Sequence, residues 1–453
     1  MIVIRTSSRF LIEKSYIFGV IFNEFLGVEY AIEQDETINN IEIRLPNGKC
    51  IFVSSSWWDK IGESYFSYAS LPESVTLISN QFIIEKDIPV LIGTGNFNVT
   101  NSEIDCDIDI FATCFLMLSR LEEVIIQKRD DHDRFEAFNS IACKFNFLQR
   151  AIVDEYVEML WNMINTLDPS LSRKNLDFEN EISCDVDFPF NPISYSFFLS
   201  MRRSLRFLIK EYSPAKSLMT LFNYFCNLIG IPRKDEFREN LSWIMDVNEK
   251  QGNKVSFFFI TYRTSVFDPN FDFQSEKMIS LIKEINRRGH NLGIHPGYEC
   301  YKNEKNFITS VEKLKQSFID NDIDQNEIGG RMHCLRYDIA KTPSFFENAG
   351  LSYDSSLGFA EKPGFRCGTC REFSMFDLHR RRPLSLKQRP LINMECSIIE
   401  EKYEGLGCSE AAEKRFLSFK NLVKKYNGKY TLLWHNSNFD TSQSKAMYQR
   451  IIN

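Results

Sequence analysis

From about residue 180 to its end, the chain alternates between short apolar runs and amphipathic segments. The run Lys254–Ile260 (KVSFFFI) predicts a buried strand, and Phe307–Ile319, with apolar residues at helical spacing, predicts a helix. Strands that alternate with helices are expected to lie parallel in one sheet or barrel, with the helices outside. The predicted strands are 181–184, 254–260, 291–294, 331–335, 391–399 and 430–434, and the predicted helices are 278–285, 307–319, 343–349 and 410–426.

The first 180 or so residues follow no such alternation. Two short strands, Ile41–Leu45 and Cys50–Ser54, flank the turn residues Pro46-Asn47-Gly48, and amphipathic helices are expected at Ile108–Ile126 and Ala151–Leu167. We therefore predict a smaller α+β N-terminal domain over residues 1–178, with a docking or substrate-presenting role. A barrel-like α/β domain over residues 179–453 follows it, with a helical insertion at about 192–250.

Composition indicates a soluble protein that does not bind nucleic acid. Hydrophobic residues make up 43% and charged residues 25% of the 453 residues, and the net charge is -7. An acidic chain lacks the bulk positive charge that sequence-independent binding to nucleic acid requires. Residues 1–26 intersperse charges among apolar residues, unlike a signal peptide, and no run reaches the ~20 apolar residues of a membrane span. We expect a cytoplasmic location.

Carboxylates and histidines collect where the predicted strands end. Asp185 and Asp187 follow the first strand of the second domain, His295 follows 291–294, His333 lies in 331–335, and His435 follows 430–434. Active groups of barrels lie at this carboxyl edge. Each residue alone has an ordinary structural explanation, but three of the six histidines falling at one edge predict a divalent metal site, with zinc as the expected ion.

Several motifs in this order resemble those of the polysaccharide deacetylases, the NodB-homology group or carbohydrate esterase family four. The resemblance extends to a bacterial branch with an uncharacterised N-terminal domain, and it covers nearly the whole chain. The motifs are Ser183–Asp187 (SCDVD), Gly289–Pro296 (GHNLGIHP), Gly364–Cys370 (GFRCGTC), Leu432–Asn436 (LLWHN), and, in the N-terminal domain, Phe115–Glu123 and Ile152–Tyr156.

This resemblance implies a distorted (β/α)7-type barrel and hydrolysis of a non-peptide C–N bond, releasing acetate from an N-acetylated sugar or glycan in surface polysaccharide synthesis. Asp185 then corresponds to the general base and Asp187 to a metal ligand. His295 corresponds to the first histidine of the metal motif, Arg331 to the arginine that orients the base, and His435 to the proton donor. Further expected substrate contacts are Arg366, Tyr298 and Trp434.

The metal motif departs from the family pattern at one position. The family usually has a second histidine four residues after the first, where this chain has Glu299. Either Glu299 replaces the missing ligand, His333 supplies it from the next strand end, or metal binding is weak or lost. We favour His333, because imidazole is the better zinc ligand.

Two other functions remain open from the sequence. One is a catalytically inactive, carbohydrate-binding protein on the deacetylase fold, which the altered metal motif favours. The other is a different metal-dependent amide hydrolase that shares the site. The sequence does not identify the sugar, the acceptor or the oligomeric state.

Overall fold

The computed structural model describes residues 1–62, 65–209, 212–229, 234–439 and 441–453. The chain has a mixed α/β fold built on several sheets, as expected for the α/β class. Among the described residues, no helix is long and apolar enough to cross a membrane.

The N-terminal region is built around a six-stranded mixed sheet with the order β2-β1-β3-β4-β8-β7. The predicted hairpin is present, because β3 and β4 pair antiparallel across the expected turn. The elements are β1 (Ile2–Thr6), α1 (Leu11–Phe18), a π-helix (Gly19–Leu26), β2 (Tyr30–Gln34), β3 (Ile41–Arg44), β4 (Cys50–Val53), α2 (Ser56–Lys60), β5 (Thr76–Ile78), β6 (Ile88–Val90), β7 (Gly93–Val99), β8 (Glu103–Ile108), α3 (Ile110–Leu118), α4 (Leu121–Ile125), α5 (Ile141–Lys144) and α6 (Ile152–Leu167).

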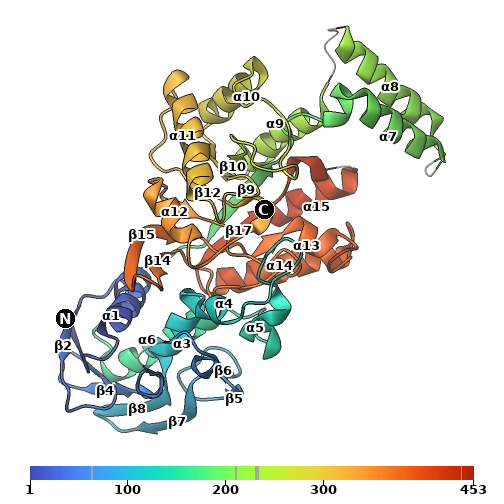
Figure 1. Ribbon diagram of the computed structural model, residues 1–453. Coiled ribbons are helices and arrows are strands. Elements are labelled where there is room, and N and C mark those ends of the chain that lie inside the picture. Colours follow the sequence, from blue (N-terminus) through green and yellow to red (C-terminus); the bar gives the residue numbers. More distant parts are fainter. Residues whose placement is uncertain (63–64, 210–211, 230–233, 440) are drawn as a thin grey trace.

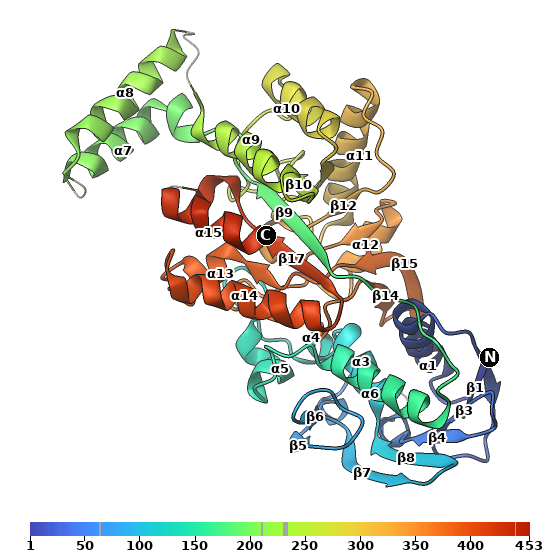
Figure 2. The same cartoon turned by 180° about the vertical axis from the view of Figure 1, so that it is seen from behind.

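The rest of the chain forms a nine-stranded sheet with the order β14-β15-β13-β12-β11-β10-β9-β17-β16 (Figures 1 and 2). All neighbours pair in parallel except β14 and β15. The strands are β9 (Glu179–Val186), β10 (Val255–Phe259), β11 (Asn291–Ile294), β12 (Gly329–Gly330), β13 (Tyr353–Asp354), β14 (Phe373–Asp377), β15 (Arg382–Gln388), β16 (Asn393–Met394) and β17 (Lys429–Leu433).

Helices connect and flank these parallel strands. The central strand β10 is buried along its whole length, which is why its sequence is a continuous apolar run rather than an alternating one. The helices are α7 (Phe197–Ile209), α8 (Pro214–Leu228), α9 (Glu236–Glu249), α10 (Glu276–Arg287), α11 (Glu304–Asp320), α12 (Thr342–Asn348), α13 (Glu395–Ile399), α14 (Glu410–Lys425) and α15 (Ser442–Ile452).

A distorted (β/α)7-type barrel is expected from the resemblance, but among the described residues the sheet does not close, since the edge strands β14 and β16 do not pair. The N-terminal region covers β14 instead. The Tyr16 hydroxyl donates to the Ser374 carbonyl at 2.8 Å, and the Ser374 amide donates to the Glu24 carboxylate at 3.0 Å. The polar groups at this edge are thus partly satisfied by the N-terminal helices rather than by barrel closure.

Four local predictions differ from the structure. Residues 331–335 form no strand, because β12 ends at Gly330 and the positive φ angles of Cys334 and Leu335 turn the chain. Residues 391–399 divide into β16 and α13. The helix expected at 108–126 is broken at Arg120, whose φ is 54°. The helix expected at 343–349 begins and ends one residue earlier, as α12.

The predicted helical insertion contains α7 and α8, which form a hairpin that projects from the rest of the molecule (Figures 1 and 2). The third helix of the insertion, α9, returns the chain to β10. The Asn240 side chain of α9 donates to the Asn436 carbonyl at 2.9 Å, which ties this helix to the loop after β17.

Candidate functional site

The carboxyl ends of neighbouring parallel strands bring the candidate residues together. Asp185 is the penultimate residue of β9 and Asp187 follows the strand, while His295 follows β11. His333 lies three residues beyond β12, and His435 lies two residues beyond β17. Because all these strands run in the same direction, their ends meet at one edge of the sheet, as the sequence predicts.

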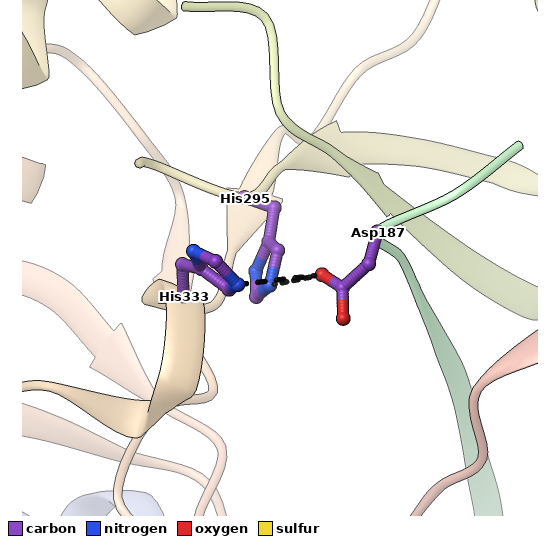
Figure 3. A group of neighbouring side chains, drawn as sticks. All are labelled: Asp187, His295 and His333. Carbon is purple, nitrogen blue, oxygen red and sulfur yellow. Dashed lines mark ion pairs between the residues drawn. The ribbon is translucent and has the colours of Figure 1, made fainter. Parts of the chain in front are cut away.

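Asp187, His295 and His333 form a cluster with the geometry of a metal centre. The Asp187 Oδ1 atom lies 3.4 Å from His295 Nε2 and 3.7 Å from His333 Nε2. Figure 3 shows the two imidazole rings and the carboxylate converging on one point from separate segments. Tetrahedral ligands about 2.0–2.1 Å from zinc lie about 3.3–3.5 Å from each other. The carboxylate oxygen lies at or near this distance from each imidazole, and all three ligand atoms lie within 4.8 Å of one another.

Hydrogen bonds at the far side of each ring fix the orientation of both histidines. His295 Nδ1 donates to the Arg331 carbonyl at 2.5 Å. His333 Nδ1 lies 2.8 Å from Oδ1 of the fully buried Asp268. With each Nδ1 occupied as a donor, the neutral rings present the Nε2 lone pair to the cluster, the arrangement that metal-binding histidines adopt.

The buried Oδ1 atom of Asp187 has no hydrogen-bond partner in the described structure. An unsatisfied buried carboxylate oxygen is costly, and a cation between it and two imidazole nitrogens would satisfy it. Burial alone raises the pKa of Asp187, but the interactions with His295, His333 and His435 hold it well below its usual range. The carboxylate therefore stays ionised, as a metal ligand must. This donor set fits a divalent metal.

A second pair, Asp185 and Arg331, lies beside the cluster. Arg331 Nη1 donates to Asp185 Oδ1 at 2.8 Å, and both side chains are buried. The guanidinium also donates to the Ser183 hydroxyl at 2.8 Å and to the Ser355 carbonyl at 2.8 Å. The other carboxylate oxygen of Asp185 lies 3.9 Å from His295 Nε2. Arg331 thus fixes one oxygen of Asp185 and leaves the other facing the cluster.

His435 faces the cluster from the opposite side of β9. Its Nε2 lies 4.0 Å from Asp187 Oδ2, and its Nδ1 lies 2.6 Å from Oε1 of the buried Glu395. Burial lowers the pKa of His435, but the Glu395 carboxylate more than offsets this and raises it well above its usual value. Asn438 also donates to the same Glu395 oxygen at 2.8 Å. The imidazolium form is therefore favoured, with its Nε2–H directed at the site.

Glu299, the alternative third ligand, lies outside the cluster. Its carboxylate is half exposed and pairs with Arg336 Nη1 at 3.2 Å. Tyr298 lies nearer, with its ring centroid 6.3 Å from that of His333. Its hydroxyl lies 2.9 Å from His132 Nδ1, and the Arg336 guanidinium stacks on its ring at 3.7 Å.

Two predicted substrate contacts are buried structural residues. Arg366 donates to both oxygens of Glu123, at 2.9 and 2.6 Å, and to the Gly358 carbonyl at 2.7 Å. These N–H groups of Arg366 thus make hydrogen bonds inside the protein. Trp434 is 1% exposed and stacks on Phe439 at 5.4 Å. Both side chains are buried, so the structure does not offer either of them as a surface for a sugar, and their contact with substrate stays a prediction.

Sequence reasoning missed Asp268 and Glu395, which orient His333 and His435. Asp268 lies nine residues beyond β10 and also accepts from the Thr264 and Tyr298 amides at 2.7 Å each, so a loop brings it to the site. Nothing near it in the sequence indicates this. Glu395 is the one acidic residue in the apolar segment predicted as strand 391–399, and it is buried. An acid within an apolar segment indicates a buried polar contact, so the sequence does hold a signal for this residue.

An apolar pocket of about 640 Å³ opens next to the cluster. Its wall includes Phe188, directly after Asp187, and Asp268, the partner of His333. Leu199 of α7 and the exposed Val266 and Phe267 extend the apolar lining toward the projecting hairpin.

Comparisons with known proteins give a family model for the N-terminal part of the chain and a structural match. Residues 2–169 match the model of a family of unknown function (DUF7033), a range that lies within the predicted domain 1–178. No curated protein matches the chain. Among solved structures, the chain is similar to a crystal structure named "putative polysaccharide deacetylase from Mycobacterium smegmatis". The identity is 13%, the TM-score is 0.40, and the match covers 62% of this chain and 84% of that one.

Proposed function

We propose that the protein is a metal-dependent amide hydrolase that removes acetyl groups from an N-acetylated sugar or glycan precursor. The observation that carries this proposal is the convergence of Asp187, His295 and His333 beside the Asp185–Arg331 pair. The acetylated sugar as substrate, and a place in surface polysaccharide synthesis, come from the motif resemblance.

The donor set supports zinc as the ion, held by Asp187, His295 and His333. Two imidazoles and one carboxylate are a common ligand set of catalytic zinc sites, in which a position stays open for water or substrate. When bound, a divalent metal polarises the substrate carbonyl and lowers the pKa of a coordinated water toward about 7.

The remaining residues divide the proton transfers between them. Asp185, held by Arg331 through one oxygen, accepts a proton from the attacking water through the other. His435, kept protonated by Glu395, donates its Nε2 proton to the departing sugar nitrogen. Asp185 lies beside His295, and His435 lies beside the second oxygen of Asp187, so one group serves the attacking water and the other serves the leaving group.

The ordered charge pairs support an enzyme over an inactive binding protein. A carbohydrate-binding scaffold has no use for a base oriented by a buried arginine or an acid oriented by a buried glutamate. Both pairs are present here together with the ligand cluster.

The Asp185→Asn variant tests the proposal. Acetate release from N-acetylglucosamine oligomers and N-acetylated sugar nucleotides is expected to fall about 10²–10⁴-fold, while bound zinc, measured by mass spectrometry, stays the same. The exposed Asp324→Asn is the matched control and is expected to keep full activity. Unchanged turnover in Asp185→Asn, or no acetate release by the zinc-loaded wild type, contradicts the proposal.

A further inference from the structure

The hairpin of α7 and α8 carries an unusual concentration of exposed apolar side chains. Fourteen of the twenty-six large apolar side chains that are exposed in the described chain lie within residues 197–229. Phe198 is 75% exposed, Leu218 is 71% exposed and Ile209 is 68% exposed. Patches of this kind mark surfaces that bind another protein or a membrane.

The two helices pack in the reverse of the usual soluble pattern. Small polar side chains are buried between them: Ser200, Ser204 and Ser217 are at most 4% exposed, and the Ser204 and Ser217 hydroxyls lie 2.5 Å apart. The large apolar side chains point outward from both helices. Figures 1 and 2 show that the hairpin projects away from both sheets, so the body of the protein does not cover these side chains.

The charge of the hairpin is opposite to that of the whole protein. Its described residues include Arg202, Arg203, Arg206 and Lys216 and no acidic residue, whereas the chain has a net charge of -7. Interfacial helices combine large apolar side chains with arginine and lysine in this way, because the cations bind anionic headgroups while the apolar groups enter the acyl boundary. Helices of 13 and 15 residues are too short to span a bilayer.

The hairpin is also continuous with the candidate site. The chain passes from Asp187 through Phe188 and Phe190 to α7. Phe188 and Phe190 line the apolar pocket together with Leu199 of α7. The exposed Val266 and Phe267 lie on the same rim. A surface that received the hairpin would therefore lie near the entrance to the site.

We propose that the α7–α8 hairpin docks on the surface of an anionic lipid bilayer, with its exposed apolar side chains inserted among the lipids and its arginines on the headgroups. A bilayer is favoured over a protein partner because exposed apolar residues recur at helical spacing along both helices, as they do in interfacial helices, and because the positive charge is local to the hairpin. This docking is independent of the proposed hydrolytic function.

Sedimentation with vesicles tests the proposal. The full-length protein is expected to bind vesicles of phosphatidylcholine and phosphatidylglycerol (7:3) more tightly than pure phosphatidylcholine, and to lose affinity as salt is raised. The triple variant Phe198→Ser, Ile209→Ser, Leu218→Ser is expected to bind at least about tenfold more weakly. A matched control changes three apolar side chains of similar exposure elsewhere on the protein and is expected to bind like the wild type. It is the triple variant Leu77→Ser, Phe138→Ser, Ile319→Ser.

The far-ultraviolet circular dichroism and melting temperature of each variant confirm that it is folded, so that a loss of binding reports on the surface alone. A second set, Arg202→Gln with Arg206→Gln, is expected to remove the preference for anionic vesicles. Absence of vesicle binding by the wild type overturns the proposal, as does equal binding by the hairpin variant. The proposal is also overturned if light scattering shows a stable dimer of the wild type and the hairpin variant is monomeric, because the hairpin then binds a second copy of the chain.

Discussion

At the scale of single residues, the site depends on which nitrogen of each histidine is free. The buried Asp268 carboxylate accepts a hydrogen bond from His333 Nδ1, and the Arg331 carbonyl accepts one from His295 Nδ1. Both Nε2 atoms therefore face Asp187. Burial raises the pKa of Asp268, but the hydrogen bonds from His333 and from the Thr264 and Tyr298 amides lower it to about 2. Asp268 therefore remains an acceptor throughout the pH range in which the site would work.

Metal binding discriminates between His333 and Glu299 as the third ligand. Losing a group that only hydrogen-bonds a metal ligand reduces metal affinity about 10–100-fold, and Asp268→Asn is expected to reduce zinc affinity by this amount. His333→Ala removes a ligand itself and is expected to reduce zinc affinity by more. Glu299→Gln should retain zinc, because its carboxylate pairs with Arg336 outside the cluster. Competition with a chromogenic chelator measures all three. Zinc loss in Glu299→Gln equal to that in His333→Ala contradicts the assignment.

At the scale of the element, short strands with glycine position the ligands. The two-residue strand β12 passes close to β11, and a Cβ on Gly330 would lie 2.5 Å from Ile294 Cγ2 and 2.7 Å from the Ile294 carbonyl oxygen. This close approach sets the spacing between His295, which follows β11, and Arg331, which follows β12. The sheet therefore depends on glycine at this position for its packing.

Gly330→Ala is expected to destabilise the protein by about 1–3 kcal/mol, since the added methyl group forces β11 and β12 apart. Urea unfolding measures the loss, and zinc titration should show weaker binding from the same displacement. The control is Gly62→Ala, where a Cβ meets no atom within 4 Å and φ is not positive. A cost no larger than that of the control would show that the strands can separate freely.

At the scale of the whole molecule, the N-terminal region and the large sheet are joined through a buried ionic contact. Glu123 binds both Arg120 and Arg366, and all three side chains are at most 2% exposed. Burial raises the pKa of Glu123, but Arg366 and Arg120 together lower it to about 2. The Val153 amide also donates to the Gly368 carbonyl at 2.8 Å. The segment predicted to contact substrate therefore joins the two regions.

Arg366→Ala is expected to cost about 3–5 kcal/mol in the free energy of unfolding, because it removes one partner of a buried charge pair. The loss should shrink as the pH falls from about 4.5 toward about 2, since a protonated Glu123 no longer needs the guanidinium. Arg380→Ala, which removes an exposed arginine, is the control and should cost less than about 1 kcal/mol. A cost equal to the control at neutral pH contradicts this structural role.

The sequence predicts those parts of the fold that local pattern determines. Apolar runs such as 254–260 and helical spacing such as 307–319 indicate the alternating elements, and the ends of parallel strands indicate where Asp185, Asp187, His295 and His435 gather. Sheet closure is not local. Whether the outer edge of β14 pairs with a further strand or packs against the N-terminal helices depends on residues some 350 positions away.

The sequence by itself determined the α/β class and the residue types available at the carboxyl edge of the sheet, because strand direction and side-chain chemistry are local properties. Only the tertiary structure decided that His333 rather than Glu299 joins the cluster, that Asp268 and Glu395 orient the histidines, and that Arg366 and Trp434 are buried. Each of these depends on contacts between segments distant in the chain, and such contacts form only when folding brings those segments together.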